Sequence, residues 1–204
     1  MLFRSVRDAL AIAPAEPVEV PRDYRRQREL PTDQRLELLV DRLADYNASV
    51  HLCAQTDIAS TLAGVLHGRA AQRIGIPDGL DRSWLAEFDG AIEVDSQDVP
   101  AARLNRLDGV VTSSAVTCAE TGTIFLDASA AQGRRALTLV PDLHVCVVDL
   151  SSVVAGVPEA IARLHPQRPT TLISGPSATS DIELERFEGV HGPRTLEVLI
   201  RTDA

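Results

Sequence analysis

The chain has 204 residues, of which 45% are hydrophobic and 24% are charged, and its formal net charge is −9 at pH 7. A chain of this length buries one sizeable core, and the composition is typical of a globular protein. The acidic balance argues against nucleic acid and against insertion at an anionic membrane surface, because no basic surplus is present to neutralise phosphates. We therefore expect a single globular domain that binds neither.

All 20 basic residues are arginines, and the chain contains no lysine. This composition excludes Schiff-base chemistry and a phosphate-binding lysine of the Walker type. A ligand carboxylate or phosphate must therefore be held by arginine, by histidine or by backbone N–H groups.

The three cysteines, Cys53, Cys118 and Cys146, lie far apart in apolar segments and form no C-x-x-C pair. They are expected to be small buried side chains, and they are too few to hold a four-cysteine iron–sulfur cluster. The chain also lacks an H-x-x-x-H pair, a G-x-S-x-G elbow and a G-x-G-x-x-G fingerprint. We expect no metal and no cofactor on this chain.

The first 13 residues lack the uninterrupted apolar segment of a signal peptide, because Arg4, Arg7 and Asp8 interrupt it. No apolar run reaches transmembrane length. These features, together with three cysteines that suit a reducing compartment, predict a cytoplasmic protein.

Residues 2–12 have the apolar spacing of a short amphipathic helix, and four prolines then punctuate residues 13–31. Proline interrupts regular helix, so residues 13–31 are expected to form an extended arm. We divide the chain into residues 1–31, an N-terminal helix with a proline-rich arm, and residues 32–204, a single α/β domain.

Within the domain, strand-like and helix-like segments alternate, which indicates a mainly parallel sheet covered by helices. The expected strands are residues 49–54, 70–76, 91–94, 110–118, 123–126, 144–148, 170–173 and 195–200, and the expected helices begin near residues 32, 56 and 151, the last ending near residue 164.

The stretch from residue 170 to residue 193 gathers turn and polar residues after a short apolar strand. The turn Ser174-Gly175-Pro176 is followed by Ser177, and Gly192-Pro193 follows His191. Polar groups at the end of a strand are a usual way for an α/β protein to build a pocket, although ordinary turns explain the same residues.

Ser180 and Glu183 have the spacing of a capping box, which predicts the start of a helix. Asp181 and Glu183 would already place negative charge at that helix start. The pocket therefore suits a hydroxyl, an amine or a metal-bound group better than a phosphate.

Three further positions have side chains suited to a site. Glu120, in the sequence Glu120-Thr121-Gly122-Thr123, could act as a general base or nucleophile, although a hairpin turn also explains this tetrad. Arg134 offers a guanidinium group for a carboxylate or phosphate, or lies in an exposed basic loop. His144 is either a core histidine or a proton donor at a pocket wall.

Five motifs in this order resemble one known family. They are AETGT (119–123), GRRALTLVP (133–141), HVCVV (144–148), ISGPSATSDIE (173–183) and GVHGP (189–193). Together they resemble the LUD domain of the lactate-utilisation protein C (LutC/YkgG) family over roughly residues 107–200.

The resemblance implies a three-layer α/β fold like that of the NagB/RpiA/CoA-transferase superfamily, with a mainly parallel sheet and flanking helices. It also implies a role in oxidising L-lactate to pyruvate beside partner proteins that carry iron–sulfur clusters, with this chain as the subunit without a redox metal. Two positions depart from the family pattern: Ala115 stands where an aspartate is expected, and Asp142 where a second proline is usual.

The leading hypothesis is therefore a lactate-utilisation subunit whose pocket holds a small carboxylate or hydroxylated ligand. Glu120 is the candidate catalytic residue. The candidate ligand-binding residues are Thr121, Gly122, Thr123, Arg134, His144, Ser174, Gly175, Ser177, Asp181, Glu183 and His191. Arg134 is expected to hold a carboxylate, and Ser177, Asp181 and Glu183 to order hydroxyl groups.

Two alternatives stay open at this point. One is a free-standing enzyme that acts on a CoA thioester or a sugar phosphate through Glu120. The other is a structural scaffold that binds partner proteins through the arm. The site itself requires that the Glu120 turn and the two glycine–proline turns converge at one rim of the sheet.

Overall fold

The computed structural model describes residues 19–179, 187–188 and 192–203. A six-stranded sheet forms its centre, with the strand order β1-β12-β7-β4-β2-β3, and every pair of neighbouring strands is parallel. The strands are β1 (Ser49–Cys53), β12 (Thr195–Arg201), β7 (Leu143–Asp149), β4 (Gly109–Ser113), β2 (Arg73–Ile76) and β3 (Ala91–Val94). This arrangement confirms the predicted α/β fold with a mainly parallel sheet.

The apolar run of β7 explains why the sheet is covered on both faces. Successive side chains of a strand point to opposite faces. Val145 and Val147 join one core, and Cys146 and Val148 join another. Both sets are buried, as expected for a parallel strand in the middle of a sheet.

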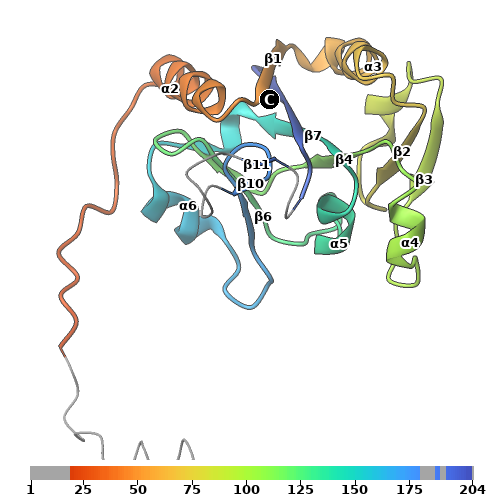
Figure 1. The fold of residues 1–204 in the computed structure, drawn as a ribbon. Helices are drawn as coiled ribbons and strands as arrows, with labels where there is room; N and C mark the ends of the chain where they lie inside the picture. Colours follow the sequence, from red (N-terminus) through yellow and green to blue (C-terminus); the bar gives the residue numbers. More distant parts are fainter. Residues whose placement is uncertain (1–18, 180–186, 189–191, 204) are drawn as a thin grey trace, which may run out of the picture.

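Each face has its own cover (Figure 1). Helix α3 (Ile58–Gly68) and the 3-10 helix η2 (Arg82–Leu85) pack on the Val145 face. Helix α2 (Thr32–Asp45) and a second sheet pack on the Cys146 face. The molecule therefore has three layers, of which the layer on the α2 side contains strands as well as helices.

The second sheet has four strands in the order β8-β5-β6-β9. They are β8 (Val153–Val154), β5 (Val116–Cys118), β6 (Thr123–Leu126) and β9 (Thr171–Ile173), and helix α6 (Val157–Arg163) packs beside them. The smaller elements are α4 (Ala101–Leu104), α5 (Arg135–Leu139), the 3-10 helices η1 (Gln55–Asp57) and η3 (Leu150–Ser152), and the paired strands β10 (Ala178–Thr179) and β11 (Phe187–Glu188).

The predicted helix over residues 151–164 is wrong in its first half. Val153 and Val154 instead pair with Thr117 and Cys118 as strand β8, and α6 begins only at Val157. The carboxylate of Glu159 accepts a hydrogen bond from the backbone N–H of Gly156 at 2.8 Å, which fixes the start of the helix.

The start of β2 and the N-terminal arm can also be compared with the predictions. The strand expected over residues 70–76 begins only at Arg73, because Ala70 has a φ of +54°. Residues 19–31 contain neither helix nor strand, as expected for an extended arm, and leave the body at the start of α2 (Figure 1). The helices predicted at residues 2–12 and from Ser180 lie outside the described residues.

Within the described part of the chain, none of the helices has the length and hydropathy required to cross a bilayer.

Candidate functional site

The Glu120 turn connects β5 to β6 and closes against α2. Gly122 has a φ of +60°, and a Cβ atom at this position would lie 2.8 Å from the Cβ of Arg42. Only glycine combines this backbone conformation with so close an approach. The backbone N–H of Glu120 donates to the carbonyl of Ala155 at 3.1 Å, so the turn is also fastened to the segment before α6.

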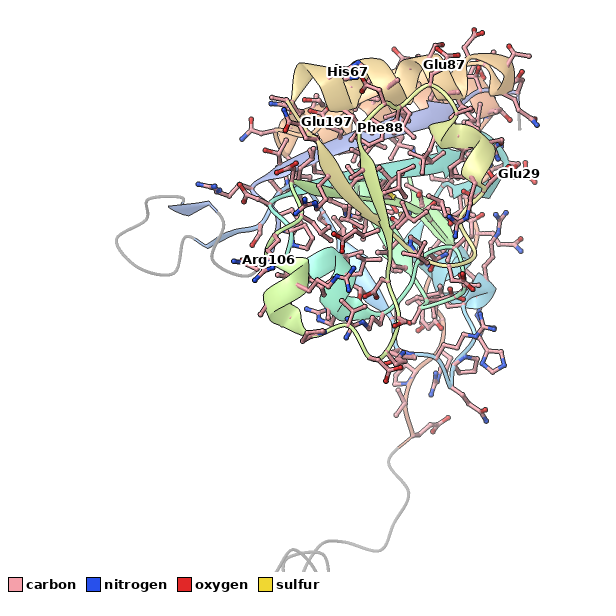
Figure 2. All side chains as sticks on the ribbon, turned by 90° about the vertical axis from the view of Figure 1, so that its right-hand side faces the viewer. Glu29, His67, Glu87, Phe88, Arg106 and Glu197 are labelled. Atoms are coloured by element: carbon pink, nitrogen blue, oxygen red, sulfur yellow. The ribbon has the colours of Figure 1, made fainter. Side chains whose placement is uncertain are left out.

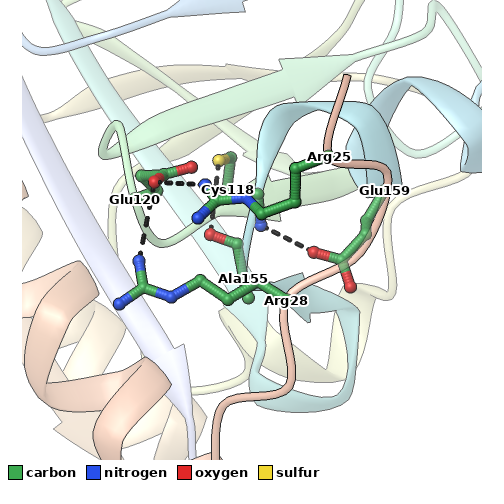
Figure 3. Close-up of polar contacts among 7 residues, drawn as sticks. Arg25, Arg28, Cys118, Glu120, Ala155 and Glu159 are labelled. Atoms are coloured by element: carbon green, nitrogen blue, oxygen red, sulfur yellow. Dashed lines mark hydrogen bonds and ion pairs between the residues drawn. The ribbon is translucent and has the colours of Figure 1, made fainter. Parts of the chain in front are cut away.

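The carboxylate of Glu120 is held by two arginines of the arm (Figure 3). Arg25 Nη2 lies 2.8 Å and Arg28 Nη1 lies 3.5 Å from Glu120 Oε1. The Glu120 side chain is 35% exposed, so these are surface ion pairs. Glu120 can act as a base or nucleophile only if Arg25 and Arg28 move away from its carboxylate. The sequence pattern did not indicate this contact, because Arg25 and Glu120 are 95 positions apart.

A chain of hydroxyl groups connects the Glu120 turn to the Ser174 turn. Thr121 Oγ1 donates to Thr123 Oγ1 at 2.8 Å, and Thr123 Oγ1 lies 2.8 Å from Ser174 Oγ. The pairing of β6 with β9 brings the two turns into this register. Gly175 has a φ of +86°, and a Cβ there would lie 2.6 Å from the Cβ of Tyr46, so this turn also rests on the end of α2.

The two glycine–proline turns line one cavity of about 230 Å³, which we call the turn cavity. The backbone N–H of Ser177 donates to the carbonyl of Pro193 at 2.8 Å and thereby ties the turns together. The lining residues are Arg135, Thr138, Leu139, His144, Thr171, Leu172, Ile173, Gly175, Pro176, Ser177, Gly192, Pro193 and Leu196. The structure thus brings together His144, Gly175 and Ser177, while Glu120 lies outside this lining.

Of the two buried polar residues in the lining of the turn cavity, His144 and Thr138, His144 is the more deeply buried. Its side chain is 1% exposed, its Nε2 lies 2.8 Å from Thr112 Oγ1, and its Nδ1 has no partner among the described residues. Burial lowers the pKa of His144 to about 4, because a charged imidazolium is disfavoured in an apolar interior. The ring is therefore neutral at pH 7.

The hydroxyl of Thr112 lies between the His144 ring and the Cys146 thiol. The hydroxyl of Thr112 donates to Cys146 Sγ at 3.8 Å, and burial raises the pKa of the Cys146 thiol to about 12. In the tautomer with the proton on Nε2, His144 donates to Thr112 and Nδ1 is an acceptor; in the other tautomer Thr112 donates to Nε2 and Nδ1 carries the proton. In either tautomer Nδ1 has no partner among the described residues.

Arg134 and Arg135 lie in different surroundings. The guanidinium of Arg134 donates Nε and Nη2 to the carboxylate of Asp95 at 2.8 and 2.9 Å, and the Asp95 side chain is only 4% exposed. Arg134 lines a second cavity and not the turn cavity, whereas Arg135 lines both. The sequence pointed to Arg134 for a ligand carboxylate, but its neighbour Arg135 is the arginine that lines the turn cavity with His144.

The Asp142 departure has a local partner. Its carboxylate accepts hydrogen bonds from the Arg194 guanidinium at 2.8 and 2.5 Å, and these bonds hold the pKa of Asp142 below its usual value. The contact anchors the residue that follows the Gly192-Pro193 turn. At the other departure, the backbone N–H of Ala115 donates to the carbonyl of Phe125 at 2.9 Å.

Three predicted ligand-binding residues, Asp181, Glu183 and His191, lie outside the described residues. Among the residues that the structure does place, no group of three or more His, Cys, Asp or Glu side chains has the geometry of a metal site.

Two histidine–carboxylate contacts on the α3 side of the molecule were not anticipated from the sequence. His51 Nε2 lies 2.7 Å from Glu197 Oε2, and His67 Nε2 lies 2.7 Å from Asp89 Oδ1. Figure 2 labels one residue of each contact, Glu197 and His67. Glu197 is buried and also pairs with Arg69. A buried carboxylate requires such partners, so the contacts of Glu197 with His51 and Arg69 are explained by the stability of the fold.

Comparisons with known proteins give a consistent result. Residues 36–200 match the family model described as the LUD domain. The chain is 40% identical over 194 residues to lactate utilization protein C of Deinococcus radiodurans, which covers 93% of this chain and 90% of that protein. It is 35% identical over 101 residues to lactate utilization protein C of Geobacillus thermodenitrificans, which covers 46% of this chain and 42% of that protein.

A solved structure is similar as well. The crystal structure of a DUF162 family protein from Deinococcus radiodurans matches with a TM-score of 0.72 and 36% sequence identity, covering 85% of this chain and 100% of that chain.

Proposed function

The chain belongs to the LUD-domain family, as its motifs predict, and we propose that it is the ligand-binding subunit of a lactate-utilisation system. The names of its relatives support this role. In this proposal the chain works in the cytoplasm, and iron–sulfur proteins act as its partners in the oxidation of L-lactate to pyruvate. The redox centres belong to those partners.

The observation that carries the proposal is Nδ1 of buried His144, which has no partner among the described residues, in a cavity that an arginine also lines. We assign the tautomer in which Nδ1 is an acceptor, and a buried acceptor without a partner costs free energy that a ligand with a hydroxyl group restores. A 2-hydroxy acid has the two groups that the cavity requires. Its hydroxyl donates to His144 Nδ1, and its carboxylate pairs with the guanidinium of Arg135.

This assignment makes the cavity selective for hydroxyl over keto groups. L-Lactate has a hydroxyl proton to donate to Nδ1, whereas the keto oxygen of pyruvate is only an acceptor. One hydrogen bond contributes about 1 kcal/mol, which corresponds to about fivefold in affinity. We therefore expect L-lactate to bind at least about fivefold more tightly than pyruvate or propionate.

Isothermal titration calorimetry on the full chain tests the proposal with L-lactate, pyruvate and propionate. Arg135→Gln should weaken binding of all three acids by about tenfold or more, because one charge-assisted hydrogen bond contributes about 1.5–3 kcal/mol. Arg103→Gln is the matched control, since Arg103 is exposed, pairs with Glu93 and lines neither cavity.

Equal affinity for L-lactate and propionate, or an unchanged affinity in Arg135→Gln, would show that the turn cavity is not the hydroxy-acid site. In cells, a strain that lacks this protein should regain growth on L-lactate with Arg103→Gln but not with Arg135→Gln.

The role of Glu120 as a nucleophile towards a CoA thioester stays a prediction. Its carboxylate forms ion pairs with Arg25 and Arg28, which occupy Oε1. Incubation with an acyl-CoA, followed by mass spectrometry of the intact chain, tests it. A covalent adduct that Glu120→Gln abolishes would support the enzyme alternative.

A further inference from the structure

A second and larger cavity, of about 780 Å³, lies beyond Arg135 on the side of β2 and β3. We call it the strand-end cavity, because Pro77 and Asp78 follow the last residue of β2, and Asp95, Ser96 and Gln97 follow the last residue of β3. Its volume is in the range of small-molecule sites, about 300–1,000 Å³. The proposed hydroxy-acid site does not use it.

The position of this cavity in the sheet favours a binding site. From β2 the chain continues to β3 on one side, and from β4 it continues through the second sheet to β7 on the other side. The direction in which successive strands are added to the sheet therefore reverses between β2 and β4. Ligands of open α/β sheets bind outside the carboxyl ends of the strands at such a reversal.

The wall that closes the cavity is the loop over residues 127–133, and it is firmly held. Its carbonyl groups at Ala130 and Ala131 accept the backbone N–H groups of Gly79 and Ser113, each at 3.0 Å. Within the loop, the backbone N–H of Asp127 donates to the side chain of Gln132 at 2.6 Å.

Ala128 in the same loop has a φ of +55°, a conformation that is unfavourable for a residue with a side chain. The bonds from Gly79, after β2, and from Ser113, the last residue of β4, hold the loop in this shape. The cavity is therefore preformed rather than assembled around a ligand.

Two guanidinium groups mark one end of the cavity for an anion. Asp95 fixes Arg134 through Nε and Nη2, while Arg134 Nη1 makes no hydrogen bond to any residue that the structure describes. Arg135 lies beside it and also lines the cavity. Because Asp95 and the Val99 carbonyl take Nε and Nη2, Arg134 contributes the single nitrogen Nη1, and the guanidinium of Arg135 supplies the charge and the planar donors that phosphate oxygens accept.

The rest of the lining suits a flat apolar group with hydroxyl groups attached. Pro77, Val94, Leu126 and Pro169 supply apolar surface. The polar side chains of Ser96 and Gln97 lie at the ends of the strands, where they can bond ribose hydroxyl groups.

We propose that the strand-end cavity binds a phosphorylated nucleoside, with the phosphate at Arg134 and Arg135 and the base on the apolar lining. Arg135, Thr138 and Thr171 line both cavities. The nucleotide and the hydroxy acid would therefore occupy opposite sides of the same arginine.

Calorimetric titration of the full chain with ADP, adenosine, ribose 5-phosphate and inorganic phosphate tests the proposal. ADP should bind at least tenfold more tightly than the other three, since it alone engages the arginines and the apolar lining. Gln97→Trp should weaken ADP at least tenfold by filling the cavity, and leave L-lactate unchanged because Gln97 does not line the turn cavity. Arg135→Gln should lower the affinity for both ADP and L-lactate, and Arg103→Gln should leave both affinities unchanged.

A measurement on the unmodified protein gives an independent readout. Phenylglyoxal should modify Arg135 at least threefold more slowly in the presence of ADP, as followed by peptide mass spectrometry.

No binding of ADP, or binding equal to that of inorganic phosphate, would overturn the proposal, as would Gln97→Trp with unchanged ADP affinity. If ADP fails while L-lactate binds, only this proposal falls. If L-lactate fails while ADP binds, the hydroxy-acid proposal falls and the nucleotide site stands.

Discussion

The Glu120 turn and the turn cavity stand next to each other and differ in almost every physical respect. Both rest on the end of α2, and the hydroxyl groups of Thr121, Thr123 and Ser174 connect them. Glu120 is 35% exposed and charged, with arginine partners. His144 is 1% exposed and neutral, with one nitrogen that has no partner in the described structure.

This difference shows which kind of residue points to a ligand. A half-exposed carboxylate satisfies its charge with water and with any nearby arginine, so its surroundings say little about chemistry. A buried nitrogen has no such choice, and a missing partner among the described residues is the observation on which the proposed ligand contact of His144 rests. Substitutions can test the support that α2 gives to both regions, the burial of His144 and the exposure of Glu120.

The largest effect is expected from the two turn glycines. Gly175→Ala places a Cβ 2.6 Å from the Cβ of Tyr46 at a φ of +86°, and Gly122→Ala places one 2.8 Å from the Cβ of Arg42 at a φ of +60°. Each should lower the free energy of unfolding by about 3 kcal/mol through backbone strain and overlap. Urea unfolding of the purified variants measures this.

Gly64→Ala is the control for the glycine series. Gly64 lies within α3, and a Cβ there would meet nothing within 4 Å, so alanine should raise the free energy of unfolding by about 0.5–1 kcal/mol. Turn variants within about 0.5 kcal/mol of the parent protein would show that α2 does not support the two regions.

The second effect concerns the dependence of stability on pH. The pKa of His144 is about 4 in the folded protein, below the 6.5 of an unperturbed histidine. Between these values the unfolded chain binds more protons, so stability falls as the pH decreases from about 6.5 to about 4. At pH 5 the loss from this group is about 2 kcal/mol relative to pH 7.

His144→Gln removes the titrating group and should remove this loss. Unfolding measured at pH 7 and at pH 5 gives the comparison, in which the difference between variant and parent changes by about 2 kcal/mol in favour of the variant at the lower pH. Carboxylates titrate equally in both proteins and cancel. Parallel pH profiles would mean that His144 is already solvated or charged.

The smallest effect is expected at Glu120. The double variant Arg25→Ala/Arg28→Ala removes both ion pairs and should cost no more than about 1 kcal/mol, because both partners are exposed at the surface. The difference should vanish in about 1 M salt, where the Debye length is about 3 Å.

Reaction of the Glu120 carboxylate with a water-soluble carbodiimide should increase in the same variant. Arg22→Ala/Arg26→Ala is the matched control, since it removes the same charge from the arm without touching Glu120. A cost well above 1 kcal/mol, insensitive to salt, would make the arm an integral part of the fold.

Much of the fold could be predicted from the sequence, because buried strands leave a strong local pattern. The apolar β-branched runs at residues 144–148, 123–126 and 195–200 lie in β7, β6 and β12. Two short elements, β8 and α5, were missed. β8 exists because Val153 and Val154 pair with a strand more than 30 residues earlier, and no local propensity encodes that contact.

The candidate site was predictable in its turns but not in its partners. Gly175 and Gly192 were recognisable from glycine–proline chemistry, and they line one cavity. The choice between Arg134 and Arg135 depended on Asp95, which lies 39 residues before Arg134 and takes up its guanidinium. Sequence reasoning had no means to see that neighbour.

The sequence by itself determined what kinds of groups this protein can offer. Without lysine, every fixed positive charge on a side chain is a guanidinium, and the alternation of apolar runs dictates a parallel sheet covered on both faces. Only the tertiary structure decided which groups are satisfied, because hydrogen-bond partners are set by contacts between distant segments. Thr112 and His144, 32 positions apart, meet in one 2.8 Å contact, and Nδ1 of the imidazole has no partner among the residues that the structure describes.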